Sequence, residues 1–476
     1  MTPPPFARKL VLAAAGVVAF VLTAASPRYG YHRDELYFRM LEPAWGYVDQ
    51  PPLVPLIAGA LGDHLVLMRA PATIAAACSV VLVGLLVREL GGSSRAQAWG
   101  AWTYAGTTVC LNFGHVLLTS AFDLVAWPLI CLCVVRAELR DRPRWWLVAG
   151  VVAGLASYNR LLVALLLVGI ALGLLLHGPR RRLLSPHVLG GALVALVLAL
   201  PNVLYQAGHD WPQLAMGEAL AENNASDVRV FMWVLLVVGL GPPMAYVWVR
   251  GLVALWRRPD WAPVRFLAPA FVLVVVFTFV SGAQPHYPLF PLIAVFAAGV
   301  VVVHPGVHRW RWVWAPLVLV NVWVAAVVSL PVLPVDVVGR TPVPAMNMVI
   351  ADQVGWPTYV DQVRAVASSV AQEQPVVITS NYGEAGAIDR FASELPVFSG
   401  QNAIFDRARP PDSAGTVVMV GFQYAAVRDL FGSCEIVDEL DNGVGVDNEE
   451  QGAPVAVCRA PVAPWSELWP EFRHLD

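Results

Sequence analysis

Eleven long apolar segments fill the first 330 residues of this chain, and most are close to the length that a helix needs to cross a bilayer. A chain of 476 residues with 57% hydrophobic and 14% charged residues is not an ordinary soluble domain. The fifth segment is short, and the break at Asn159-Arg160 is either a kink or a full turn. The predicted spans are residues 10–26, 68–87, 96–113, 116–135, 145–158, 161–177, 188–205, 230–249, 266–281, 288–303 and 312–330.

The basic residues predict how these spans are oriented. If the N-terminus is cytoplasmic, seventeen Lys and Arg lie on the inner side of residues 1–330 and six on the outer side. This is a clear positive-inside bias. An odd number of spans then places the chain after about residue 331 outside the membrane. We therefore expect a multi-pass membrane protein, and a first span that is not a signal peptide.

Charge and pattern divide the chain into two parts. Residues 1–330 carry 23 basic and 14 acidic side chains (+9), and residues 331–476 carry 8 basic and 20 acidic side chains (−12). Helix-like and strand-like runs alternate in the second part, which predicts a small extracytoplasmic α/β domain. Its acidity argues against nucleic acid as a partner. The first part is the predicted membrane domain, with an outer first loop at residues 27–67.

The cysteines agree with this topology. Four of them lie in apolar spans, where a small apolar side chain fills space. Cys434 and Cys458 are the two cysteines of the outer part, and each sits in a strand-like run. Because the outer compartment is oxidising, we predict that these two form a disulfide bond.

The first outer loop holds an unusual concentration of polar and aromatic residues. Charged groups at the edge of a bilayer are costly to bury without partners, so they mark candidate functional groups. The alternative is an interfacial helix whose charges face water. The aromatic residues predict a shelf at headgroup level that stacks on a sugar or sits in the interface. The residues concerned are Arg33, Asp34 and Glu35, then Tyr37, Trp45 and Tyr47, with Asp49 as a further acid.

Other residues on the outer side are expected to lie near the same cavity. Asp123 stands early in the fourth span and has to face protein or water. Arg160, after Asn159, either extends to the headgroups or binds a lipid phosphate through its planar fork of donors. His286 and Tyr287 join the ninth and tenth spans, and a structural role for this histidine is the alternative to a titrating one.

These motifs resemble a known family. Asp34-Glu35-Leu36-Tyr37-Phe38, followed by Trp45-Gly46-Tyr47-Val48-Asp49-Gln50-Pro51-Pro52, is similar to the first-loop signature of bacterial polytopic glycosyltransferases. These proteins group with the protein mannosyltransferases and the aminoarabinose transferases, which share the GT-C architecture. Phe122-Asp123, Asn159-Arg160, Pro201-Asn202 and Asn381-Tyr382-Gly383-Glu384-Ala385-Gly386 extend the resemblance over nearly the whole chain.

The resemblance implies a function. It implies a GT-C-like fold of about eleven transmembrane helices, a polyprenyl-phosphate sugar as donor, inversion at the anomeric carbon and Asp34 as catalytic base. Relatives often have a lysine near the place of Gln284, so the phosphate contact is expected from Arg160, Arg33 or Arg69. Glu35 is predicted to orient the acceptor, which is a lipid, a glycan or a protein. Tyr37, Trp45, Tyr47, Asp49, Asp123, Asn159, His286 and Tyr287 are the predicted substrate contacts.

The chemistry is consistent with this set of residues. Transfer from a sugar phosphodiester to a hydroxyl is one displacement, in which a carboxylate accepts the proton of the acceptor and a cation stabilises the leaving phosphate. A divalent metal near Asp34 and Glu35 stays open, although no clear ligand set supports one. The rival functions are a transporter or lipid flippase, which would explain polar residues in a polytopic protein, and a sensor with an outer binding domain.

Overall fold

The computed structural model describes residues 3–62, 64–177, 180–307 and 309–475. The chain forms two compact units. The membrane unit consists of Met1–Ser26, Gln50–Leu53 and Arg69–Leu330, and the sheet unit consists of Pro27–Asp49, Val54–Met68 and Pro331–Asp476. The first outer loop, which the sequence grouped with residues 1–330, therefore folds mostly with the C-terminal segment.

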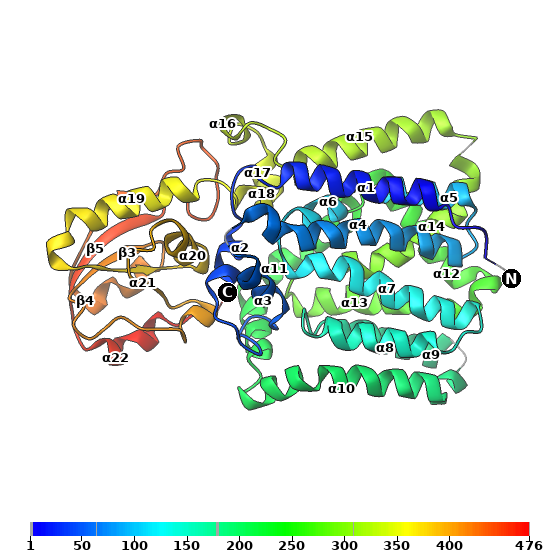
Figure 1. Cartoon of the computed structure of the whole chain (residues 1–476), viewed down its shortest axis with the longest axis horizontal. Coiled ribbons are helices and arrows are strands. Elements are labelled where there is room, and N and C mark those ends of the chain that lie inside the picture. Colours follow the sequence, from blue (N-terminus) through cyan, green and yellow to red (C-terminus); the bar gives the residue numbers. More distant parts are fainter. Residues whose placement is uncertain (1–2, 63, 178–179, 308, 476) are drawn as a thin grey trace. The chain divides into compact units, whose positions relative to one another are not determined.

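The membrane unit is a bundle of helices that run side by side (Figure 1). Among the described residues, six helices are long and apolar enough to cross a membrane: α1 (Arg8–Ala25), α4 (Leu65–Glu89), α7 (Thr119–Leu139), α10 (Pro186–Gly208), α14 (Leu289–Val307) and α15 (Arg311–Ser329). Three apolar helices are shorter: α8 (Trp145–Ala156), α9 (Val163–His177) and α13 (Leu267–Ser281). The chain is thus a multi-pass membrane protein. The remaining helices are α5 (Ser94–Ala105), α6 (Thr108–His115), α11 (Pro212–Val238) and α12 (Pro242–Arg257), with the 3-10 turns Arg180–Leu184 and Pro259–Val264.

One predicted span is not a straight helix. Residues 230–249 cover the end of α11 and the start of α12, and the two helices meet at an angle of 94°. The cause lies in Gly239-Leu240-Gly241-Pro242-Pro243, because Pro242 starts a new helix and Gly241 takes a φ of +95°. A Cβ on Gly241 would lie 1.5 Å from Oδ1 of Asn321, so this bend also needs glycine for space. The predicted span 96–113 is likewise two helices, α5 and α6.

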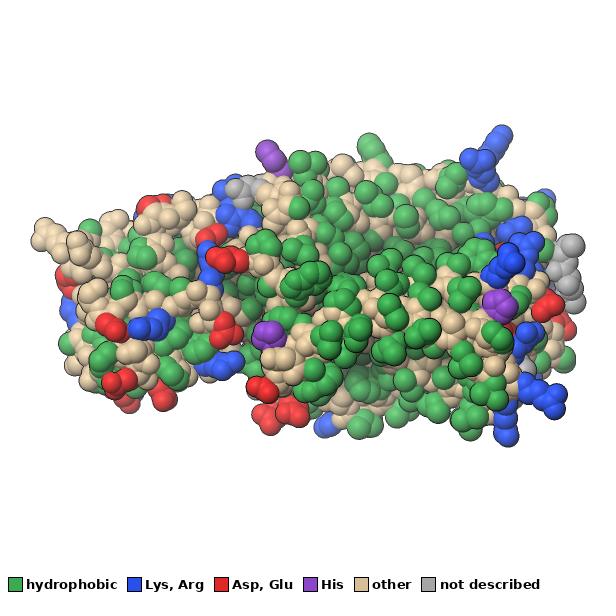
Figure 2. Space-filling model, turned by 60° about the horizontal axis from the view of Figure 1, so that its bottom comes forward, with side chains coloured by type: hydrophobic (Ala, Val, Ile, Leu, Met, Phe, Trp, Pro, Cys, Tyr) green, Lys and Arg blue, Asp and Glu red, His purple; other side chains and the backbone are tan. Residues whose placement is uncertain are grey.

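The surface of the helical unit is that of a protein in lipid. Figure 2 shows apolar side chains covering the long helices, with Lys and Arg gathered at one end of the bundle. Large apolar residues such as Phe20, Trp312 and Trp323 are 67–79% exposed. Between the helices, glycines permit close approach: Gly251 on α12 and Gly299 on α14 each lie against the backbone of the other helix.

The sheet unit is an α/β layer, as the alternating pattern predicts. Its five strands have the order β2-β1-β3-β5-β4. The strands are β1 (Val376–Thr379), β2 (Val397–Ser399), β3 (Thr416–Val420), β4 (Phe431–Glu439) and β5 (Pro454–Pro461). β1 is parallel to β2 and β3, while β5 is antiparallel to β3 and β4. Every residue of β1 and β3 is buried, which explains why these two strands are continuous apolar runs.

Helices and turns complete the sheet unit. Trp465, Trp469 and Phe472 near the C-terminus are buried against β1, β3 and β5 in one apolar core. The first outer loop supplies α2 (Arg33–Met40) and α3 (Leu53–Leu61). The others are α16 (Val335–Val338), α17 (Val343–Met346), α18 (Met348–Ala351), α19 (Trp356–Ser369), α20 (Tyr382–Phe391), α21 (Tyr424–Val427) and α22 (Trp465–Leu468), with 3-10 turns at Ala371–Glu373, Asn402–Ile404, Arg428–Leu430 and Trp469–Phe472.

Cys434 and Cys458 are joined by a disulfide bond in the structure. They occupy directly opposed positions on the antiparallel strands β4 and β5, which brings their Cα atoms to 4.1 Å. The bond fastens β4, an edge strand whose other side has no partner strand among the described residues, to the interior of the sheet.

A prediction follows for the purified protein. Because the two sulfurs are bonded, neither Cys434 nor Cys458 is expected to react with an alkylating reagent until a reductant is added. Peptide mass spectrometry after alkylation in denaturant measures this directly. Cys110, which is buried and free, is the control that labels in denaturant without reductant. Labelling of both outer cysteines without reductant would exclude the bond.

Candidate active site

Helix α2, in the polar part of the first loop, begins with a reciprocal cap. The ring of His32 accepts a hydrogen bond from the backbone N–H of Asp34 at 3.1 Å, and Oε2 of Glu35 accepts one from the N–H of His32 at 2.9 Å. This arrangement is a capping box, which satisfies two N–H groups at the start of the helix. Glu35 is fully buried in this role. Its geometry therefore supports a structural function, and it gives no support to direct contact with an acceptor.

Asp34, the next residue of the same turn, is differently placed. Its Oδ1 accepts a hydrogen bond from the hydroxyl of Tyr382 at 3.0 Å, and Nδ1 of His32 lies 3.9 Å from the same oxygen. The side chain is 28% exposed, and Oδ2 has no hydrogen-bond partner within the described part of the sheet unit. One oxygen is thus held, while the other has no hydrogen-bond partner among the described residues and is available to accept a proton.

Arg33 is occupied by the sheet unit. Its guanidinium forms an ion pair with Glu449 and lies 4.8 Å above the ring centre of Tyr382. Burial lowers the pKa of Arg33, but the acidic groups of Tyr382, Glu450 and Asp352 outweigh this effect and raise it. A cation already paired with the carboxylate of Glu449 is a poor receptor for a further anion. The predicted phosphate contact of Arg33 therefore gains no support from this geometry.

The acids around Arg33 have unusual proton affinities. Burial raises the pKa of Asp352 to about 7, although the nearby Arg33 acts in the opposite direction. Burial also raises the pKa of Glu450. Oδ1 of Asp352 and Oε2 of Glu450 are buried without a hydrogen-bond partner among the described residues, which agrees with a cost for ionising them.

We expect this cluster to make folding stability depend on pH. The folded protein keeps the Asp352 proton up to about pH 7, whereas an unfolded aspartate loses it near the ordinary value of 3.8. The folded state therefore binds more protons in this range, and its stability falls as the pH rises from about 4 to 7. The pKa difference corresponds to roughly 4 kcal/mol at most.

Thermal unfolding between pH 5 and 8 measures this effect. Asp352→Asn, which carries no titrating proton, is expected to lose less Tm over this range than the wild type. Asp336→Asn, at an exposed aspartate of the same unit, is the matched control and should behave like the wild type. An unchanged slope in Asp352→Asn would contradict the assignment.

Two of the three residues of the predicted aromatic shelf are buried in the structure. Trp45 is 68% exposed, but Tyr37 is 1% and Tyr47 6% exposed. The hydroxyl of Tyr47 donates to the carbonyl of Glu42 at 2.6 Å, which closes the loop on itself. Tyr37 packs against Tyr382 with ring centres 4.7 Å apart. Of the three, Trp45 has a face available to a sugar or to the lipid interface.

Asp49 is bound inside the same loop. Its Oδ1 accepts a hydrogen bond from the hydroxyl of Tyr37 at 3.0 Å. Burial raises the pKa of Asp49 to about 7, and the hydrogen bond from Tyr37 offsets part of that effect. The bond joins α2 to a residue 12 positions later in the loop, so Asp49 has a structural role in holding the loop in shape.

The membrane unit gathers a second polar group. Asp123, one turn into α7, is 1% exposed and accepts hydrogen bonds from Nη1 of Arg160 at 2.9 Å, Nδ2 of Asn159 at 3.2 Å and Nε1 of Trp127 at 3.2 Å. Nη2 of Arg160 donates to the hydroxyl of Thr119. These bonds use two of the five guanidinium N–H groups, and the other three have no hydrogen-bond partner among the described residues. Asp123 thus orients Arg160, a role different from the predicted substrate contact.

The loop between α13 and α14 lies beside this group. The Arg160 guanidinium is 5.3 Å from the ring centre of Tyr287, and Nε2 of His286 is 3.2 Å from the hydroxyl of Ser120. Burial and the Arg160 cation lower the pKa of His286 to about 3, so its ring is neutral near pH 7. The structure therefore favours the structural alternative for this histidine.

Arg69, the third predicted phosphate contact, is fully buried in α4 and donates from Nη1 to the carbonyl of Ser26 at 2.7 Å.

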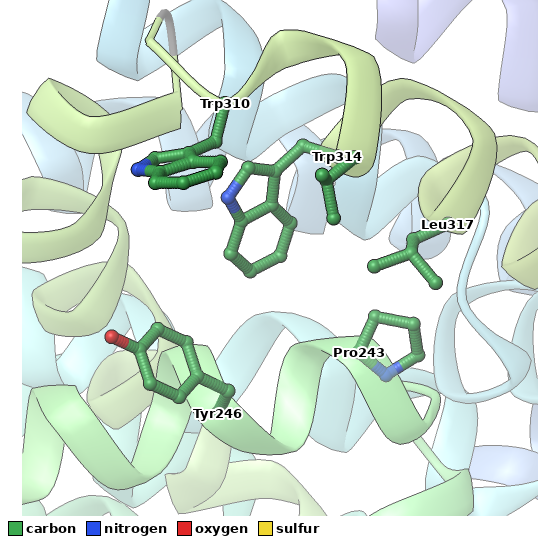
Figure 3. Close-up of a pocket in the computed structure, with 6 residues that line it drawn as sticks. Pro243, Tyr246, Trp310, Trp314 and Leu317 are labelled. Atoms are coloured by element: carbon green, nitrogen blue, oxygen red, sulfur yellow. The ribbon is translucent and has the colours of Figure 1, made fainter.

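Figure 3 shows a pocket in the membrane unit between the start of α12 and the start of α15. It is apolar and open, with a volume of about 360 Å³. Its lining consists of Pro243, Tyr246, Trp310, Val313, Trp314 and Leu317, so it contains no acid, base or cation for sugar transfer. Among the described residues there is also no group of three or more His, Cys, Asp or Glu placed to hold a metal ion.

Sequence reasoning missed Tyr382 as a partner of Asp34. The signal lies in Asn381-Tyr382-Gly383-Glu384, one of the stretches that extend the family resemblance. The structure shows a helix start closed by a capping box, in which Glu384 binds the N–H groups of Ser380 and Asn381. The N–H of Tyr382 donates to Gln401, so the backbone donors of Ser380, Asn381 and Tyr382 are all occupied.

Comparisons with known proteins agree with the architecture. Residues 49–205, about a third of the chain, match the family described as dolichyl-phosphate-mannose-protein mannosyltransferase. The matched stretch includes Asp123 and Arg160 and begins after Asp34. No curated protein matches the sequence significantly.

Solved structures match over nearly the whole chain. The crystal structure of ArnT from Cupriavidus metallidurans bound to undecaprenyl phosphate is similar with a TM-score of 0.60 and 16% identity, covering 94% of this chain and 97% of that one. The same protein in the apo state has a TM-score of 0.55 with the same identity and coverage. The Archaeoglobus fulgidus oligosaccharyltransferase crystallised with zinc and sulfate has a TM-score of 0.46 and 11% identity, covering 88% of this chain and 69% of that one. The chain is therefore a multi-pass membrane protein with the GT-C glycosyltransferase fold, and its residues 49–205 match the protein mannosyltransferase family.

Proposed function

We propose that this protein is an inverting glycosyltransferase that moves a sugar from a polyprenyl-phosphate donor to a hydroxyl of a lipid, glycan or protein. The observation that carries the proposal is the fold shared along 94% of the chain with ArnT, whose structure was determined with undecaprenyl phosphate. The reaction takes place at the outer face of a bacterial cytoplasmic membrane. The N-terminus is cytoplasmic and the segment after residue 331 is extracytoplasmic, in line with the positive-inside bias.

Asp34 is the general base of the proposed reaction. The acceptor oxygen attacks the anomeric carbon while its proton passes to the free Oδ2 of Asp34. The bond between the anomeric carbon and the phosphate oxygen breaks, and the polyprenyl phosphate leaves with the electron pair. This single displacement inverts the configuration at the anomeric carbon. It needs one carboxylate as base, whereas glycosidases use a pair of carboxyl groups.

Arg160 is the proposed receptor of the donor phosphate. The departing polyprenyl phosphate gains negative charge in the transition state, so a fixed cation lowers the barrier more than a proton donor does. The three guanidinium N–H groups that have no partner among the described residues suit a phosphate, because a planar fork binds two oxygens at once. Asp123 and Thr119 hold the guanidinium in place before the donor arrives.

Proteoliposomes test this proposal. The purified chain is mixed with polyprenyl-phosphate mannose or a polyprenyl-phosphate pentose, together with a bacterial envelope extract as acceptor. Release of free polyprenyl phosphate reports turnover whatever sugar and acceptor are used. We expect release with at least one donor, with acceptor-dependent labelling of a product. Absence of release with every donor, in a preparation with a normal Tm, would contradict the proposal.

The transporter alternative gains no support from the described helices. In the six long apolar helices, the buried charged residues lie near helix ends: Arg69 and Asp123 one turn after a start, and Glu89 and Glu138 in a last turn. Transport sites usually lie near the middle of the bilayer.

A further inference from the structure

Helix α2 of the first loop packs closely on α20 of the C-terminal segment. The contact depends on two glycines of α20. A Cβ on Gly386 would lie 2.6 Å from the carbonyl carbon of Leu36, and a Cβ on Gly383 would lie 3.0 Å from the Cβ of Arg33. Any larger residue at position 386 would push α2 away from α20. The glycines therefore let the first loop approach a segment almost 350 residues later in the sequence.

Tyr382, the first residue of α20, lies at this contact and is held on several sides. The Arg33 guanidinium lies over its ring at 4.8 Å, and the ring of Tyr37 is 4.7 Å away. Its backbone N–H donates to Oε1 of Gln401 at 2.6 Å. Its hydroxyl donates to Oδ1 of Asp34 at 3.0 Å. Burial and the Asp34 carboxylate raise the pKa of Tyr382 well above its ordinary value, so the hydroxyl keeps its proton and remains a donor.

We infer that Tyr382 is a positioning residue for the reaction, through which the C-terminal segment fixes the carboxylate of Asp34. This inference rests on the proposed function. A carboxylate on a short side chain rotates freely in solvent, and a bond to one oxygen leaves the other oxygen with a fixed direction. The sheet unit thus has a role in catalysis. Without the Tyr382 hydroxyl, Asp34 spends less time in the orientation that accepts a proton.

Tyr382→Phe tests the inference, because phenylalanine keeps the ring contacts with Arg33 and Tyr37 and removes the hydroxyl. In proteoliposomes with the donor found active for the wild type, we expect kcat to fall on the order of 10- to 100-fold, the range for a lost hydrogen bond to a charged group. The KM of the donor should change less than about twofold, since the hydroxyl acts in the proton transfer and not in donor binding.

Tyr359→Phe is the matched control. Its hydroxyl, in the same unit, bonds to Asn448 and Asn442 at 2.7 and 2.9 Å and does not contact Asp34. We expect this variant to keep the wild-type kcat. Thermal unfolding of each variant verifies that a lower rate does not come from unfolded protein.

A double variant separates positioning from a structural effect. If Tyr382 acts through Asp34, then Tyr382→Phe should reduce the residual transfer of Asp34→Asn less than about twofold, measured with radiolabelled sugar over long incubations. Equal fold losses in both backgrounds would overturn the inference, as would a wild-type kcat in Tyr382→Phe alone. A fully active Asp34→Asn would instead overturn the proposed base, so the two failures are distinct.

Discussion

Asp34→Asn is expected to lower sugar transfer by a factor on the order of 10² to 10⁴, which is the usual contribution of a positioned general base. The amide has nearly the same shape as the carboxylate, and it can still accept a hydrogen bond from Tyr382 through its oxygen. It cannot take the proton of the acceptor. Release of polyprenyl phosphate from proteoliposomes measures the loss, and the expected change is in kcat, with the KM of the donor nearly constant.

The control for this variant is Asp336→Asn. Asp336 is an exposed aspartate of the same sheet unit, and its replacement makes the same chemical change away from the candidate site. We expect wild-type turnover. A well-folded Asp34→Asn protein with unchanged turnover would remove Asp34 as the base, and Asp49, the other first-loop aspartate, would be the next variant to measure.

Loss of Arg160 is expected to have the second-largest effect. A charge-assisted hydrogen bond contributes about 1.5–3 kcal/mol, so removal of the guanidinium should weaken donor binding roughly 10- to 100-fold. The single variant Arg160→Ala leaves Asp123 buried without its cation, and such a change alone costs about 3–5 kcal/mol of stability. We therefore expect a clear loss of Tm in Arg160→Ala as well as a higher KM for the donor.

The double variant Asp123→Asn with Arg160→Ala separates these two effects. It carries no stranded buried acid, so its Tm should recover relative to Arg160→Ala while its KM for the donor stays high. Arg229→Ala removes an arginine on the predicted outer side whose bonds go to the carbonyls of Phe279 and Val280, and it should leave donor binding unchanged. A double variant with wild-type KM would exclude Arg160 as the phosphate receptor.

The sequence was most informative where one physical constraint acts locally. A bilayer requires long apolar helices, and residues such as those of α4, α7 and α14 satisfy that requirement by composition alone. The buried strands β1 and β3 are likewise continuous apolar runs. The bend between α11 and α12 could have been expected from Gly241-Pro242-Pro243, since two consecutive prolines after a glycine favour the end of one helix and the start of another. Residues 230–249 were nevertheless predicted as one span, because the apolar segment is long enough to cross a bilayer.

The sequence identified the polar residues of the first loop as candidate functional groups. It did not show which of them is structural and which is available to a substrate. Composition cannot tell an acid that closes a capping box from an acid with a free oxygen, and Glu35 and Asp34 are neighbours in the sequence. The backbone of α2 decides between them, because it turns Glu35 back to the N–H of His32 and leaves Asp34 beside α20. Similarly, burial rather than residue type separates the exposed Trp45 from Tyr37.

The sequence by itself determined that this chain is a polytopic membrane protein with a small α/β segment at its end, because hydropathy and alternating patterns are local properties. Only the tertiary structure decided which polar side chains meet: Asp123 with Arg160, Arg33 with Glu449, and Asp34 with Tyr382. These pairs are 37, 416 and 348 residues apart, and no local pattern encodes such contacts. They arise when packing brings distant helices and loops together, because a buried charge or hydroxyl is stable only beside the partner that the fold supplies.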